Sequence, residues 1–153
     1  MLGRAMRMPA VLDRKGTRWM IQVFSPPPKV IVLINRGRKS GRLYKTPLSI
    51  LDEDPEHGEI VVSPMWGQNS DWYRNVIAGG LVEIHVRGET RQVEWRELNE
   101  SERRRAGEAF VDAHPIYSRM IARTLARLNE LEGEPVEAAM RSLPMLGLRR
   151  VES

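Results

Sequence analysis

The sequence predicts an α+β protein in which the strands of a mainly antiparallel sheet, able to close into a small barrel, precede a group of helices. Three observations support this class. Short β-branched or alternating apolar runs fill residues 29–98, and glycine, proline and aspartate turn signals separate them. From residue 99 onwards the apolar side chains follow helical spacing instead. The length of 153 residues suits one domain with one sizeable core, which we predict to span 1–153.

The first third of the chain predicts a lead-in followed by a hairpin. Residues 1–28 are loosely helical in pattern and end at three consecutive prolines, each of which removes a backbone donor. Strands are expected at 29–35 and 43–51, joined by a connection at 36–42 whose glycines can adopt positive φ. Pro47 cannot donate to a sheet ladder, so it should mark an edge strand or a bulge.

The middle of the chain alternates strands, turns and one short helix. Strands are expected at 59–63, 81–87 and 90–98, with turns at 54–58 and 88–89. Ser70 is placed to cap a helix over 71–78, which the glycines at 79–80 terminate. Along 81–87 the apolar side chains alternate with polar ones, as in a strand that buries one face.

The last third predicts helices. Asn99 and Glu102 have the spacing of a capping box, and 101–113 continues with helical periodicity. A proline then starts a second amphipathic helix over 115–131. A Gly-Glu-Pro break leads to a last short helix at 136–143 and then to a basic tail.

The composition excludes several kinds of chemistry. There is no cysteine, which rules out disulfides, thiolate metal sites and cysteine nucleophiles. His57, His85 and His114 are scattered along the chain, so we expect no metal site. The longest strongly apolar run, 30–34, is too short for a membrane span or a signal-peptide core. We therefore expect a cytoplasmic protein without a transmembrane segment.

The net charge of +4 conceals an uneven distribution. Residues 1–51 carry eleven Lys/Arg and one acid, whereas 52–153 carry thirteen Lys/Arg and nineteen acids. A basic field of this kind attracts a nucleic acid, a lipid surface or a phosphorylated small molecule, or it is simply a solvated face. No DNA- or RNA-binding motif accompanies the charge, so nucleic acid is the least supported of these partners.

The hairpin carries the strongest functional signal. Between residues 36 and 45 five cations stand beside Ser40 and two glycines: Arg36, Arg38, Lys39, Arg42 and Lys45. Guanidinium and ammonium groups next to exposed backbone amides form a combination that binds phosphates and carboxylates. The alternative is an ordinary polar hairpin tip whose charges discourage edge aggregation.

A second segment, 63–75, favours the ligand-binding interpretation. It offers broad surfaces for stacking in Met65, Trp66, Trp72 and Tyr73. Asn75 supplies an amide donor and acceptor from the first turns of the helix. We expect Trp72 to contact the core, and Trp66, which lies on a loop, to face a ligand or a partner.

Together the two segments resemble the deazaflavin (F420)-dependent nitroreductase family of small split-barrel oxidoreductases. The family pattern is a Gly-Arg-Lys-Ser/Thr-Gly hairpin, a Pro-Leu strand, a serine-containing loop and Trp-Tyr-x-Asn-Leu-x-Ala at a helix start. In this chain these elements stand in the same order at 37–41, 47–48, Ser63 and 72–78. The resemblance covers residues 30–98 and continues more weakly to Tyr117.

The resemblance implies a six-stranded antiparallel split β-barrel, like that of FMN-binding split-barrel proteins, with flanking helices. Its core would span 29–98, including the short helix at 71–78, and its C-terminal helices would span 99–143. Related barrels are often dimeric, so a homodimer is a further expectation.

The resemblance also implies an oxidoreductase that uses coenzyme F420, with FMN a less favoured cofactor. Reduced deazaflavin would pass a hydride to a small, hydrophobic, electron-poor acceptor such as a quinone, a nitro compound or an enone. Tyr117 or His114 falls where the family places tyrosines over the substrate, and would orient the substrate or relay a proton. The implied cofactor-binding residues are Arg38, Lys39, Ser40, Gly41, Arg42, Tyr44, Lys45, Thr46, Pro47, Ser63, Met65, Trp66, Trp72 and Asn75.

Two departures from the family pattern leave an alternative open. Typical members have an arginine where this chain has Tyr44, and a basic residue where it has Pro64. Arg42 could compensate, because by strand periodicity it shares a face with Tyr44 at a distance of about 7 Å. Otherwise the chain would be a non-catalytic split-barrel protein that holds a flavin-like, haem or lipid-like ligand.

Overall fold

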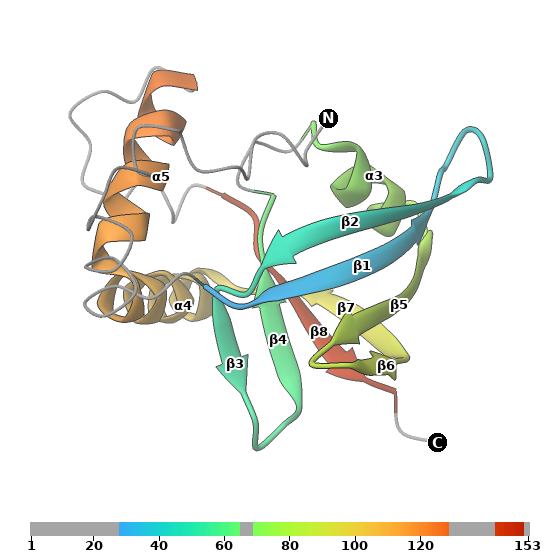
Figure 1. Ribbon diagram of the computed structural model, residues 1–153, viewed down its shortest axis with the longest axis horizontal. Coiled ribbons are helices and arrows are strands. Elements are labelled where there is room, and N and C mark those ends of the chain that lie inside the picture. The colour runs from blue at the N-terminus through green and yellow to red at the C-terminus, as the bar shows by residue number, and fades with distance from the viewer. Residues whose placement is uncertain (1–27, 65–68, 129–142, 152–153) are drawn as a thin grey trace.

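The computed structural model describes residues 28–64, 69–128 and 143–151. Within these ranges the chain forms eight strands and three helices (Figure 1). The strands are β1 (Val30–Arg36), β2 (Leu43–Ser49), β3 (Asp52–Asp54), β4 (Glu59–Val62), β5 (Leu81–Val86), β6 (Glu89–Arg91), β7 (Val93–Glu97) and β8 (Leu146–Arg150). The helices are α3 (Asp71–Ile77), α4 (Glu100–Ala113) and α5 (Pro115–Leu128). The predicted lead-in at 1–28 and the predicted last helix at 136–143 lie almost entirely outside the described residues.

The strands form two four-stranded antiparallel sheets, which corrects the single six-stranded barrel that the resemblance implies. The first sheet has the order β2-β1-β5-β6 and the second has the order β3-β4-β8-β7. Side chains from both sheets meet in one core, where each of the following is at most 1% exposed: Ile31, Leu33, Ile60, Val62, Ile84, Leu146 and Leu148. The predicted α+β class and antiparallel pairing are confirmed, because all six strand pairings are antiparallel.

One predicted strand is in fact two strands in different sheets, and another ends earlier than predicted. The expected strand 43–51 ends at Ser49 in the first sheet, and β3 begins the second sheet at Asp52. The expected strand 90–98 divides at Gln92 into β6, which pairs with β5, and β7, which pairs with β8. These predictions were wrong because alternation of buried and exposed side chains does not show where a chain bends from one sheet into another.

The predicted basic tail is an inner strand. β8 lies between β4 and β7 in the second sheet, and Leu146 and Leu148 are fully buried. Its sequence, Leu-Gly-Leu-Arg-Arg, has only two apolar side chains, so the adjacent arginines conceal the alternation. The C-terminal segment therefore completes the second sheet.

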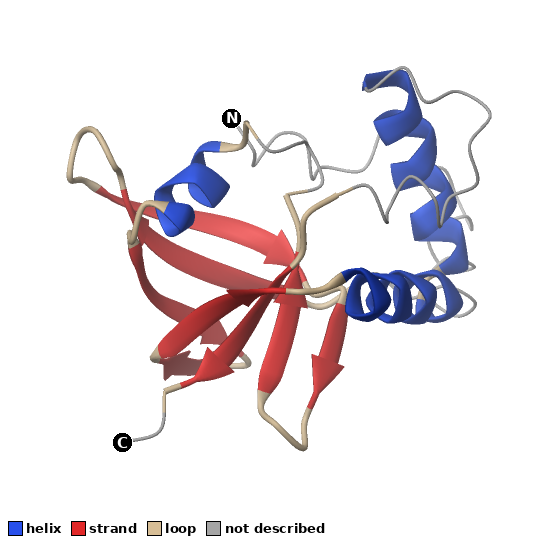
Figure 2. Cartoon of the chain, turned by 180° about the vertical axis from the view of Figure 1, so that it is seen from behind, coloured by secondary structure: helices blue, strands red, loops and turns tan. Residues whose placement is uncertain are grey.

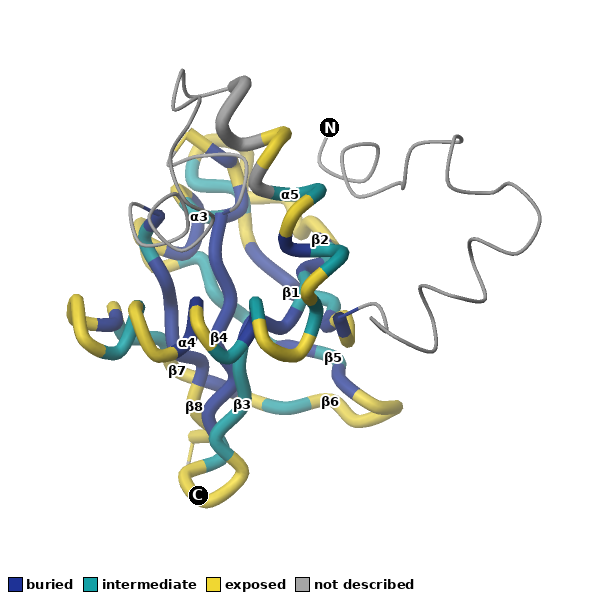
Figure 3. Tube along the Cα trace, turned by 90° about the vertical axis from the view of Figure 1, so that its left-hand side faces the viewer, coloured by how far each residue is buried: buried dark blue, intermediate teal, exposed yellow. Residues whose placement is uncertain are grey.

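The helices cover the two ends of the sheets. α3 packs on β1 near the β1–β2 hairpin, while α4 and α5 lie at the opposite end of the molecule (Figures 1 and 2). Trp72 and Val76 of α3 enter the main core, and Phe110 of α4 fills a second cluster with Leu51 and Met145. Figure 3 shows the consequence, with burial concentrated along the inner strands and exposure on the outer sides of the helices.

The helix starts follow local chemistry. Asn99 Oδ1 accepts the amide of Glu102 at 2.9 Å, and the Glu102 carboxylate accepts the amide of Asn99 at 2.8 Å, so the predicted capping box is confirmed. Ser70 occupies the N-cap position of α3 as predicted, but its side chain makes no capping hydrogen bond. Asp71 in the first turn instead complements the positive end of the helix. None of the helices in the described ranges has the length and apolar character needed to cross a membrane.

Candidate functional site

A cavity of about 490 Å³ opens where the β1–β2 hairpin meets α3. This volume falls in the range of small-molecule sites. The cavity is lined by Asn35, Gly37, Arg38, Lys39, Ser40, Tyr44, Lys45, Thr46, Pro47, Asp71, Trp72 and Asn75. Two segments about thirty residues apart in the sequence thus build one concave surface.

The inner face of the hairpin changes from apolar to polar as it leaves the core. The pair Ile31 and Leu48 is aliphatic, the next pair on the same face is Leu33 and Thr46, and the last is Asn35 and Tyr44. Because side chains alternate along a strand, all six point to the same side. The cavity therefore begins where the aliphatic core ends.

Hydrogen bonds attach the hairpin firmly to α3. Asn75 Oδ1 accepts the backbone amide of Arg38 at 3.2 Å and its guanidinium at 2.7 Å. The same guanidinium lies 3.3 Å from a carboxylate oxygen of Asp71. The amide of Asn75 donates to Asn35 Oδ1 at 2.8 Å, and Asn35 donates to Thr46 Oγ1 at 3.2 Å. The buried side-chain amides of Asn35 and Asn75 thus join β1, β2, the hairpin loop and α3 in the cavity wall.

Close backbone approach shapes the turn of the hairpin. A Cβ on Gly37 would lie 2.6 Å from Ser40 Oγ and 2.9 Å from the Tyr44 ring, so a larger residue would displace both. Gly41 has a φ of +71°, a conformation that L side chains rarely adopt. The hydroxyls of Ser40 and Tyr44 lie 3.2 Å apart. The glycines therefore allow two hydroxyl groups to meet on the cavity wall.

Three cations of the hairpin carry no opposing charge. Within the described part of the chain, Lys39, Arg42 and Lys45 form no ion pair. Lys39 and Lys45 line the cavity, whereas the guanidinium of Arg36 donates to the carbonyl of Gly41 at 2.9 Å and braces the loop. Uncompensated ammonium groups beside hydroxyls form an anion-binding surface.

The structure brings together nine of the predicted cofactor-binding residues, and these line the cavity: Arg38, Lys39, Ser40, Tyr44, Lys45, Thr46, Pro47, Trp72 and Asn75. Gly41 and Arg42 lie in the exposed hairpin loop outside the lining. Ser63 is buried and donates to the carbonyl of Pro144 at 2.8 Å. Met65 and Trp66 lie outside the described residues. Trp72 is 2% exposed and packs in the main core, so its predicted core contact is confirmed.

The two predicted catalytic residues lie elsewhere. His114 ends α4 and its ring centroid is 5.1 Å from that of Phe110. Tyr117 is in the first turn of α5 and is half-buried, which raises the pKa of its phenol. Neither is among the residues that line the cavity.

Three lining residues were not among the predicted cofactor-binding residues: Asn35, Gly37 and Asp71. Asn35 is completely buried although it is polar, and it ends an otherwise aliphatic strand. A polar side chain at an inward position of a β-branched run is the signal that could have revealed it, since buried polar groups need partners. Asp71 lies in the first turn of α3.

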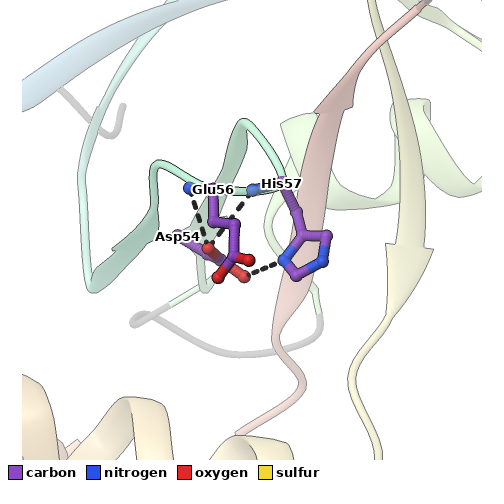
Figure 4. Close-up of side chains that lie close together, drawn as sticks. All are labelled: Asp54, Glu56 and His57. Atoms are coloured by element: carbon purple, nitrogen blue, oxygen red, sulfur yellow. Dashed lines mark hydrogen bonds and ion pairs between the residues drawn. The ribbon is translucent and has the colours of Figure 1, made fainter.

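A second polar cluster, in the β3–β4 turn, is explained by the turn itself (Figure 4). Asp54, Glu56 and His57 bring possible metal-binding atoms within 4.8 Å of one another. Asp54 Oδ1, however, accepts the backbone amides of Glu56 and His57, and its Oδ2 lies 2.6 Å from His57 Nδ1. This hydrogen bond raises the pKa of His57 and lowers that of Asp54. All these contacts close an exposed aspartate turn.

Two solved structures share the fold of this chain. One, an F420-H2 dependent reductase (FDR-A), matches with a TM-score of 0.54 and 21% identity over 79% of this chain and 94% of that one. Another, described as a domain-swapped dimer, matches with a TM-score of 0.53 and 19% identity over 93% of this chain and all of that one. At these identities the likeness establishes the fold alone, which is of the split-barrel type. No curated protein matches the chain.

The family follows from the sequence. The pattern of the F420H(2)-dependent quinone reductase family matches residues 7–129, and the chain belongs to this family. It is an oxidoreductase whose cofactor is coenzyme F420, as the resemblance to deazaflavin-dependent proteins predicted. The cavity suits an anionic ligand, because its lining includes the cations Lys39 and Lys45 and the hydroxyl-bearing Ser40 and Tyr44.

Proposed function

We propose that this reductase uses reduced F420 to reduce a small, apolar, electron-poor acceptor, with a quinone as the leading class and nitro compounds or enones as further candidates. Membership of the quinone reductase family supports the acceptor class. The observation that carries the proposal is the cavity, which is lined by two lysines without ion-pair partners among the described residues, together with Pro47 and Trp72. This membership also favours catalysis over the non-catalytic alternative.

The charged and apolar residues of the cavity would bind different parts of the coenzyme. Lys39 and Lys45 would hold the phosphate and glutamate tail of the coenzyme by charge-assisted hydrogen bonds. Pro47 would pack against the flat ring system, and the core around Trp72 would form the wall behind it. The resemblance adds Ser63, Met65 and Trp66 near the ring.

Position rather than acid–base chemistry is what the protein contributes. When bound, the reduced coenzyme supplies a hydride to the acceptor. The chain's own task is to hold two reactants at a fixed distance and orientation. A dyad of titratable catalytic groups is therefore not required. For Tyr117 and His114 the role of orienting the acceptor stays a prediction, which the turnover of Tyr117→Phe tests.

The experiment is a reductase assay with a panel of acceptors. Purified protein is mixed with reduced F420 and a quinone, a nitroaromatic compound or an enone, and coenzyme oxidation is followed by absorbance. We expect reduction of the quinone with reduced F420 and none with reduced FMN. Binding is measured separately as quenching of tryptophan emission. A protein that binds the coenzyme but reduces none of the acceptors would refute the proposed acceptor class.

We also propose that the chain forms a homodimer, on the ground that a solved structure with the same fold is described as a domain-swapped dimer. Light scattering during size-exclusion chromatography gives the mass directly. A monomer at all concentrations would end this part of the proposal.

A further inference from the structure

Asn35 occupies a special point in the first sheet. The register of β1 against β5 shifts between Ile34 and Asn35, so that Ile34 pairs with Glu83 and Asn35 with Leu81. At the same point the aliphatic face of β1 ends and the cavity begins. Asn35 is 0% exposed. A fully buried amide at an irregularity of a sheet is costly unless its hydrogen bonds are made.

Those hydrogen bonds reach both sides of Lys45. The side-chain amide of Asn35 donates to the carbonyl of Tyr44 at 3.4 Å and to Thr46 Oγ1 at 3.2 Å. Tyr44 and Thr46 are the neighbours of Lys45 in β2. Asn35 therefore holds the backbone of Tyr44 and the side chain of Thr46, the residues on either side of Lys45.

The same side chain is linked to Lys39 through two residues, Asn75 and Arg38. Asn35 Oδ1 accepts from Asn75, and Asn75 Oδ1 in turn accepts both the amide and the guanidinium of Arg38. Arg38 immediately precedes Lys39. The chain of bonds has one consistent direction, because turning either amide over would set donors against donors. Asn75 and Arg38 therefore use their polar groups in hydrogen bonds within the cavity wall.

We propose that Asn35 is a positioning residue of the coenzyme site, which acts through Thr46, Tyr44, Asn75 and Arg38 to hold Lys39 and Lys45 at the spacing that the anionic tail requires. The inference rests on the proposed coenzyme site, and it goes beyond that site by giving Asn75 and Arg38 a supporting role. Asn35 itself does not bind the coenzyme. Ordering the two ammonium groups before binding lowers the entropic cost of the complex.

The first test measures order in the hairpin without coenzyme. In Asn35→Ala, hydrogen–deuterium exchange of the amides of residues 37–41 should accelerate by about tenfold. Asn99→Ala, which removes the cap of α4 far from the cavity, is the matched control for general loss of stability. Equal exchange of residues 37–41 in the two variants would overturn the proposal.

The second test separates positioning from catalysis. Asn35→Ala should raise the Kd of F420, measured by tryptophan quenching, by about tenfold. The kcat at saturating coenzyme should stay within about twofold, since no reacting atom loses a contact. A folded variant with wild-type Kd, or one in which only kcat falls, would overturn the assignment.

A gentler pair of variants keeps the proposal testable if Asn35→Ala does not fold. Thr46→Val keeps the shape of threonine but removes the acceptor for Asn35, whereas Thr46→Ser keeps the hydroxyl. Valine should weaken coenzyme binding several-fold more than serine, and equal affinities would contradict the proposal. If wild-type protein does not bind F420, the proposed site fails, while the exchange measurement still decides whether Asn35 orders the hairpin.

Discussion

In the first sheet, Lys39, Arg42 and Lys45 of the hairpin form no ion pair with the described residues, whereas in the second sheet Arg96 and Arg149 converge on one buried carboxylate. The second group, which we call the Glu59 cluster, consists of Glu59, Arg96, Arg149 and Glu102. Arg96 binds Glu59 through two hydrogen bonds of 2.8 Å, and Arg149 binds it at 2.6 Å. Cations of the same kind thus stabilise the fold in one place and remain available to a ligand in the other.

In the Glu59 cluster the charges are paired with one another and join several elements of the fold. Glu59 belongs to β4, and its carboxylate crosses β8 directly above Gly147, where a Cβ would lie 2.7 Å from it. Beyond Gly147 it meets Arg96 of β7, whose guanidinium also binds Glu102 in the capping box of α4 at 3.0 Å. Three strands and a helix are therefore tied together. The presence of an opposing charge next to the cations, rather than the number of cations, therefore distinguishes a structural cluster from a binding surface.

The largest expected effect tests the structural side. Glu59→Ala should lower the free energy of unfolding by about 3 kcal/mol, because it leaves two arginines facing each other without their carboxylate. The side chain of Glu59 is only 7% exposed, whereas those of Arg96 and Arg149 are 34% and 44% exposed, so water replaces the lost partner only in part. Urea unfolding measures the change. The control is Glu94→Ala, which removes an exposed carboxylate of β7 and should change stability by less than about 0.5 kcal/mol. Equal effects of the two substitutions would show that the Glu59 cluster contributes no special stability.

The next effect tests the binding side. Lys39→Ala and Lys45→Ala should each weaken F420 binding by about tenfold, and the double variant by about a hundredfold. Stability should not fall, since neither lysine has an ion-pair partner among the described residues. Arg74→Ala is the control, because Arg74 is an exposed cation of α3 outside the cavity lining. Titrations at two salt concentrations should show a smaller salt effect in the double variant. Wild-type affinity in the double variant would remove both lysines from the site.

The binding side could be predicted from the sequence and the structural side could not. The cations, glycines and Ser40 of the hairpin are neighbours in the sequence, so their meeting in space needs only one turn. The partners of Glu59 lie 37 and 90 positions away, and no periodic pattern announces such contacts. The partner of Asn35 is equally distant, since Asn75 lies 40 positions further on, although the inward polar position of Asn35 is itself visible in the sequence.

The same limit explains the errors in the fold. Strand and helix identities were mostly correct because β-branched runs, turn residues and the Asn99 capping box act locally. The sheet changes at Ile50 and at Gln92, and the inner place of β8, depend on which strands pair across the core. Local patterns carry no information about that choice.

Lowering the pH should reduce the stability that the Glu59 cluster contributes. Hydrogen bonds from Arg96 hold the pKa of Glu59 below its ordinary value, and they do the same for Glu102. A depressed folded-state pKa stabilises the protein above the unfolded-state value of 4.5, and this stability is lost as the pH falls through the folded-state pKa. Urea unfolding between neutral pH and pH 3 should therefore show a shallower acid loss in Glu59→Gln than in wild type. Parallel curves would mean that other carboxylates carry the acid sensitivity.

The smallest expected effect concerns the neutral part of the hairpin. The Ser40 and Tyr44 hydroxyls share one hydrogen bond, which consumes one of their two protons and leaves one O–H free to donate to an anion. Tyr44→Phe still leaves the Ser40 O–H available, but it removes the hydrogen bond that orients this hydroxyl and should weaken coenzyme binding by about threefold. Tyr44→Arg should act in the opposite direction, because it adds a third cation beside Lys39 and Lys45. Titration of both variants by tryptophan quenching measures the two shifts. If arginine weakened binding as much as phenylalanine, the cavity wall would be recognising the tyrosine ring itself, and charge would not be what this part of the site contributes.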